Sequence, residues 1–208
     1  MSKIVELMSG RALEHGIGML VDHGRGSGSK MYVGGQANAL VAAGTVINAD
    51  DEGTTETETT SYTVPANTLV AGSTIRAKFY VHSPSANGSD TTQIALRFGA
   101  NTTASSNSGM ETGATDLANS GAVCVGDGVV QIRTAGASGT AIMFGTIAMD
   151  VATVGIALSH DESGAMATFA VDTTVANYLA VTITQSGSNA AQIAQAEAFV
   201  VDVVNPST

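Results

Sequence analysis

The chain has 208 residues, of which 12% are charged and 4% aromatic, and its formal net charge is −10 at neutral pH. An acidic protein repels phosphate backbones, so we expect no nucleic-acid partner. No stretch reaches the roughly 20 apolar residues of a membrane helix, so we expect no membrane partner either. Cys124 is the only cysteine, which excludes an intrachain disulfide, and we expect it to be a small core residue on a strand.

Residues 1–34 differ in composition from the rest and form a predicted N-terminal arm. Their apolar residues lie roughly on one face of a short helix, interrupted by glycines, which predicts an extended or partly helical segment. The Gly24–Ser29 stretch has the composition of a flexible linker. The alternative is a frayed terminus, but the arm carries many apolar residues, so we favour ordering on a partner. The candidate partner-binding residues are Ile4, Leu7, Leu13, Ile17 and Leu20.

The first residues do not resemble a secretion signal. The stretch has no uninterrupted apolar segment and carries Glu6, whereas a signal peptide needs an apolar run of 7–15 residues. We therefore expect the protein to be made in a cytosol, and to leave it only by assembly or lysis.

The densest acidic cluster follows the arm, at Asp50-Asp51-Glu52, with Glu56 and Glu58 shortly after it. Calcium requires six to eight oxygen ligands, and the alternating ligand spacing of a calcium loop is absent. We interpret the whole cluster as a solvated loop, in preference to a metal site.

From residue 36 onward, apolar and polar residues alternate with the period of a β-strand. In the first run we expect the core to be faced by Ile75, Ala77, Phe79 and Val81, with the residues between them outside. In the second run we expect the core to be faced by Thr92, Ile94, Leu96 and Phe98, with Gln93, Ala95 and Arg97 outside. Further alternating runs occur at 130–134, 141–149, 151–158, 165–172, 177–185 and 193–204. Turn residues separate these runs, so residues 35–208 are predicted to form one antiparallel sandwich or barrel.

Two of these runs are apolar on both faces, at 141–149 and 198–204. The outer face of an isolated sandwich is expected to be polar. We therefore predict that another subunit covers part of one sheet, and that the chain forms an oligomer.

Several phrases resemble the jelly-roll domains of tailed-phage virion proteins. The stretch from Tyr62 to Leu69 resembles a strand ending at Val64-Pro65 followed by a turn, and Gly72-Ser73-Thr74-Ile75-Arg76 resembles the opening of the next strand. Ile94–Gly99 and Glu197–Val204 resemble later strands of the same domains. The resemblance covers roughly residues 55–204. It implies an all-β, antiparallel jelly-roll-like β-sandwich of the head-decoration (cement), head-fibre or tail-fibre type, commonly trimeric.

The remaining candidates for chemistry do not assemble into a site in the sequence. His160-Asp161-Glu162 precedes Ser163-Gly164 and is interpreted as a turn, since general acid–base catalysis needs a positioned partner that the sequence does not identify. The other histidines, at 15, 23 and 82, lack the spacing of zinc ligands. The segment 24–30 lacks the spacing of a phosphate-binding loop. We therefore expect no catalytic activity, no metal and no cofactor.

These observations favour a non-enzymatic virion structural protein that binds and stabilises a phage head, with the major capsid protein or another virion protein as partner. It would be made in the host cytoplasm and act as a homotrimer on the capsid surface. The alternative is a receptor- or glycan-binding module of a head or tail fibre. An enzyme or lectin acting on sugars is disfavoured, because the chain has four Tyr, five Phe and no Trp for stacking.

Overall fold

The computed structural model describes residues 19–21, 31–33, 47–48, 54–85, 90–116, 122–149, 156–158, 168–187 and 193–204. In these ranges the chain is almost entirely β-structure, with one short 3-10 helix, η1 (Ala104–Ser106). The strands are β1 (Met19–Val21), β2 (Met31–Val33), β3 (Ile47–Asn48), β4 (Thr57–Val64), β5 (Thr74–Ser85), β6 (Thr91–Gly99), β7 (Ser108–Glu111), β8 (Thr115–Asp116), β9 (Ala122–Thr134), β10 (Gly139–Met149), β11 (Ile156–Leu158), β12 (Phe169–Val171), β13 (Asn177–Gln185) and β14 (Ile193–Val204).

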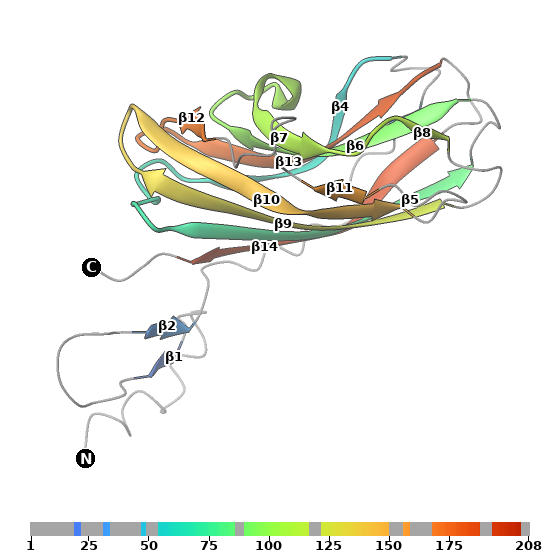
Figure 1. Cartoon of the computed structure of the whole chain (residues 1–208). Helices are drawn as coiled ribbons and strands as arrows, with labels where there is room; N and C mark the ends of the chain where they lie inside the picture. The colour runs from blue at the N-terminus through green and yellow to red at the C-terminus, as the bar shows by residue number, and fades with distance from the viewer. Residues whose placement is uncertain are drawn as a thin grey trace.

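Two antiparallel sheets stack face to face (Figure 1). One contains β3-β14-β5-β9-β10-β11 in that order, with β12 also paired to β10, and the other contains β4-β13-β6-β7, with β8 also paired to β6. We call them the seven-stranded and the five-stranded sheet.

The strand order is that of a jelly roll. A jelly roll has eight strands, which here are β3, β4, β5, β6, β7, β9, β13 and β14. One sheet has the order β3-β14-β5-β9, which is first, eighth, third and sixth. The other has the order β4-β13-β6-β7, which is second, seventh, fourth and fifth. Strands β10, β11 and β12 extend the seven-stranded sheet beyond β9. The predicted all-β jelly-roll sandwich is therefore confirmed, and the fold class alone assigns no function.

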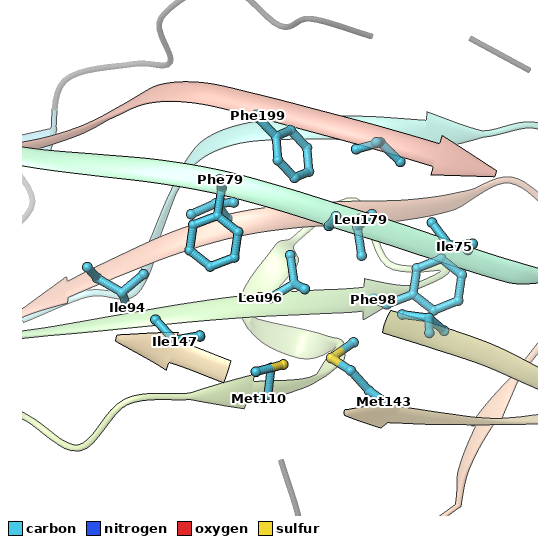
Figure 2. Close-up of a cluster of buried hydrophobic side chains, with 14 of the residues drawn as sticks. Ile75, Phe79, Ile94, Leu96, Phe98, Met110, Met143, Ile147, Leu179 and Phe199 are labelled. Carbon is cyan, nitrogen blue, oxygen red and sulfur yellow. The ribbon is translucent and has the colours of Figure 1, made fainter. Parts of the chain in front are cut away.

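The core fills the space between the sheets, as the alternation predicted. Phe79 and Phe199 project from the seven-stranded sheet toward Leu96, Phe98 and Leu179 of the other (Figure 2). All five side chains are at most 3% exposed. A small, partly open cavity beside Val81, Ile94 and Cys124 has a volume of about 10 Å³, about the size that one water molecule occupies.

The turns form where the sequence places turn residues. Strand β4 is the edge strand of its sheet and ends at Val64, directly before Pro65, which has no amide hydrogen to donate to a strand ladder. Asn67 and Gly72 adopt the left-handed region, with φ of 60° and 87°. Glycine has no Cβ and asparagine tolerates this conformation, so the chain reverses here without strain.

Ala95 differs from its prediction: it was expected outside, yet it is only 3% exposed. The register pairs Ala95 with Thr182 on one side and with Glu111 on the other. Both neighbours belong to an ion cluster on the outer face of the five-stranded sheet, described below. Such a cluster covers the small side chain between them.

The predicted arm is described only at its two short strands. Strand β1 pairs with β2 in antiparallel register, with Leu20 opposite Tyr32, and the Gly24–Ser29 stretch lies between these strands in the sequence. The proposed helical segment and the boundary at residue 35 lie outside the described residues, so the arm and its linker stay predictions.

Candidate functional site

The outer face of the seven-stranded sheet is the strongest candidate for a binding surface. Of the large hydrophobic side chains that the structure describes, Tyr80, Val125, Phe144 and Val175 are exposed, at 37%, 54%, 38% and 42%. The first three lie on β5, β9 and β10, and by strand alternation they point away from the core. Val175 lies elsewhere, in the turn between β12 and β13.

The strand register arranges this face in rows. Read from β10 through β9 and β5 to β14, the first row is Phe144, Val129, Arg76 and Asp202; the second is Thr146, Asp127, Lys78 and Val200; the third is Ala148, Val125, Tyr80 and Ala198. We call these twelve positions the outer face. An open depression on it is lined by Arg76, Lys78, Asp127, Val129, Val200 and Asp202.

The outer face carries as many positive as negative side chains, and each positive side chain lies next to a negative one. Lys78 Nζ lies 3.4 Å from Asp127 Oδ2, and the two side chains are 75% and 57% exposed. An ion pair this exposed contributes little to stability. Arg76 and Asp202 are neighbours in the adjacent row, so two cations and two carboxylates lie among apolar side chains.

Part of this surface was predicted from the sequence. Tyr80 was predicted to lie outside, and residues 198–204, which include Ala198 and Val200, were predicted to be apolar on both faces. All three are confirmed as exposed or half-buried, opposite the buried Phe199 and Val201. Val125 was missed, because Gly126 and Gly128 weaken the alternation signal in β9.

The opposite outer face carries an ion cluster centred on Arg97 of β6. Arg97 Nε and one terminal nitrogen donate hydrogen bonds of 2.8 and 3.0 Å to the two carboxylate oxygens of Glu56. Thr182 Oγ1 donates to Glu56 Oε1 at 2.5 Å, and Arg97 also contacts Glu111. The Arg97 and Glu56 side chains are only 16% and 18% exposed. The prediction of a solvated loop is therefore wrong for Glu56, since folding brings Arg97 onto it from 41 residues away.

The electrostatics of this cluster favour the ionised carboxylate. Burial raises the pKa of Glu56, but the hydrogen bonds from Arg97 and Thr182 and the charge of Arg97 outweigh it, so the pKa lies below its ordinary value. Burial likewise lowers the pKa of Arg97, and Glu56 and Glu111 more than compensate. Every charged member of the cluster is paired, so the cluster joins strands β6 and β13 to the segment that precedes β4.

Most of the other sequence candidates lie outside the described residues. These are Ile4, Leu7, Leu13 and Ile17 of the arm, Asp50-Asp51-Glu52, His15, His23 and His160-Asp161-Glu162. Leu20 lies in β1, and His82 lies on β5. Cys124 is 2% exposed in the core, as predicted, and burial raises the pKa of its thiol to about 12.

Two further findings concern only the described part of the chain. There, no three His, Cys, Asp or Glu side chains gather closely enough to hold a metal ion. Nor do the described ranges include a helix of the length and hydrophobicity that crossing a membrane requires.

Comparison with known proteins leaves the chain without an assigned family. No family model matches the sequence, and no curated protein matches it. Among solved structures, a legume lectin-like domain from Entamoeba histolytica aligns over 81% of this chain and 82% of that one, with 8% identity and a TM-score of 0.26. A score this low does not indicate a shared fold, so the fold assignment rests on the strand order.

Proposed function

We propose that this chain is a non-enzymatic virion structural protein that decorates and stabilises a bacteriophage capsid. The observation that carries the proposal is the outer face, where Tyr80, Val125 and Phe144 are exposed beside charges of both signs. Exposed apolar groups clustered among polar ones are characteristic of protein-binding surfaces.

The predicted arm supplies the contact with the capsid in this proposal. The arm docks on the major capsid protein or another virion protein through Ile4, Leu7, Leu13, Ile17 and Leu20. The sandwich lies on the capsid surface. In the predicted homotrimer three arms act together, and linked binding segments raise the overall affinity well above that of one arm. The protein is made in the host cytoplasm and reaches the particle by assembly.

Co-sedimentation of the purified full chain with phage heads that lack it tests this function. We expect saturable pelleting at a fixed ratio to the major capsid protein. Pelleting that is absent, or that rises without saturation, contradicts the proposal. The matched competitor is an excess of unlabelled chain, which displaces only specific binding.

Exposed rings on the outer face favour one alternative, a glycan- or receptor-binding module of a head or tail fibre. Tyr80 and Phe144 each present an aromatic surface beside polar groups, and sugars stack on such rings. A glycan array distinguishes the two functions. Binding that Tyr80→Ala abolishes and that Val175→Ala leaves intact supports the fibre module, whereas decoration predicts no glycan binding.

A further inference from the structure

The outer face is self-complementary when it is turned over about an axis parallel to its strands. An axis midway between β5 and β9 brings each β5 residue opposite the β9 residue of the same row in a second copy. Lys78 then faces Asp127 of the second copy, and Asp127 faces Lys78 of the second copy. In the next row Tyr80 faces Val125 of the second copy, and the reciprocal contact forms as well.

The outer strands fit the same operation. Ala148 on β10 comes opposite Ala198 of the second copy, which lets the two backbones approach closely, and Thr146 comes opposite Val200 of the second copy. In the remaining row Arg76 comes opposite Val129 of the second copy and Asp202 opposite its Phe144, so charge meets apolar side chains there and complementarity is carried by the other two rows. No like charges face each other in any row. Sheets packed face to face cross at about 30° because each is twisted, so the contacts near the axis match best.

We propose that the outer face binds the same face of a second copy of this chain in a twofold-symmetric pair. The proposal goes beyond the proposed function, because it assigns the outer face to a second copy and leaves the contact with the capsid to the predicted arm. It rests on the proposed function only for its biological setting. Twofold contacts use the same patch on both partners, which is the property that these rows have.

The size of the face sets the expected affinity. Three alternating rows span about five residues of each strand, so four strands about 4.8 Å apart cover roughly 300 Å² per copy. The roughly 600 Å² buried in total lies below the range for stable specific interfaces. We therefore expect a weak pair that forms and dissociates reversibly.

The first test is light scattering on the full chain over a range of concentrations. The twofold contact alone gives a mass of two chains, and combined with the predicted trimer it gives six. A mass of one or three chains at the highest concentration overturns the proposal. Particle binding is measured separately, so loss of pairing and loss of the decoration function are distinguished.

The sharper test exchanges the two central charges in separate chains. Lys78→Asp places two carboxylates opposite each other in a pair of identical chains, and Asp127→Lys places two ammonium groups opposite each other. We expect each variant alone to pair at least about tenfold more weakly, because facing like charges are strongly disfavoured. Mixing the two variants restores both opposite-sign contacts, so the mixture should regain wild-type affinity.

This mixing result separates contacts between chains from contacts within one chain. Each variant still carries like charges at 78 and 127 internally, so an effect confined to one chain cannot be relieved by mixing. If both variants fold, by circular dichroism, and the mixture stays as weak as its components, the twofold pairing is wrong.

A matched pair of apolar substitutions tests the same surface without touching the ion pair. Val125→Glu puts a charge against Tyr80 of the second copy and should weaken pairing at least about tenfold. Val175→Glu makes the same change at an exposed valine outside the outer face and should leave pairing unchanged. Equal effects of the two substitutions contradict the proposal.

Discussion

Arg97 on β6 donates two hydrogen bonds to the carboxylate of Glu56, which directly precedes β4, and this contact spans the intervening strand β13. Thr182 on that intervening strand completes the contact by donating to Glu56. Three segments of the five-stranded sheet are therefore joined on its outer face. This ion cluster lies at the start of β4, where the chain enters the five-stranded sheet after β3 of the seven-stranded sheet.

Glu56→Gln should lower the free energy of unfolding by about 1–3 kcal/mol at pH 7, because it removes a charge from a mostly buried hydrogen-bonded pair. Chemical denaturation monitored by circular dichroism measures this loss. Glu111→Gln is the matched control: its side chain is 44% exposed, so we expect a loss of at most about 1 kcal/mol. A larger loss at Glu111 than at Glu56 contradicts this interpretation of the cluster.

The same contact predicts a pH dependence. The pKa of Glu56 is lower in the folded than in the unfolded chain, so its stabilising contribution is complete above the ordinary glutamate pKa. The contribution is lost as the pH falls through the lower, folded-state value. The difference in stability between wild type and Glu56→Gln should therefore shrink below about pH 4. A difference that stays constant from pH 7 to pH 3 excludes this linkage.

Gly126→Ala should destabilise the sandwich by about 1–3 kcal/mol through overpacking. A Cβ at Gly126 would lie 2.0 Å from the ring of Phe79, which is itself 3% exposed in the core. Gly113→Ala is the control, since a Cβ there meets nothing within 4 Å, and we expect a change within about 0.5 kcal/mol. Thermal melts of both variants measure the two effects. Equal melting temperatures would contradict the close approach of the Phe79 ring to Gly126.

Cys124 should react with thiol reagents only when the protein unfolds. Its side chain is buried and burial raises its pKa to about 12, so the nucleophilic thiolate is scarce near neutral pH. A colorimetric disulfide reagent at pH 8 should label the native protein slowly and the denatured protein at once. Rapid labelling of the native chain would show that β9 is open to solvent.

A chain that begins at Gly34 should keep its fold and lose attachment to phage heads. The predicted arm differs in composition from the sandwich, and few core contacts are expected to cross a domain boundary of this kind. Its melting temperature should match that of the full chain, while co-sedimentation with heads should fall to background. Unfolding of the truncated chain would make the arm part of the core, and full binding would assign attachment to the sandwich.

The fold was largely predictable because burial alternates with strict period two over long stretches. In β5 the buried Ile75, Ala77, Phe79 and Val81 alternate with more exposed residues, as the sequence indicated. The pattern fails where the backbone changes register. In β14 a bulge between Ala196 and Ala198 places Glu197 outside and turns both Ala196 and Phe199 inward, a shift that hydrophobicity alone does not encode.

The sites were less predictable because they depend on pairing across strands. Glu56 and Arg97 are separated by 41 residues, and nothing local to either marks the other as its partner. The outer face likewise becomes visible only when the register aligns Val125 of β9 with Tyr80 of β5. Apolar residues on both sides of a strand indicated that a surface would be covered, but not which residues would form it.

Quantitative mass spectrometry of purified virions tests the proposed decoration of the capsid. A decoration protein is expected in intact particles at a copy number comparable to that of the major capsid protein, and also in heads separated from tails. A few copies per particle, found with the tail or with isolated fibres, would instead identify a fibre module. Absence from purified virions would contradict a structural role in the particle.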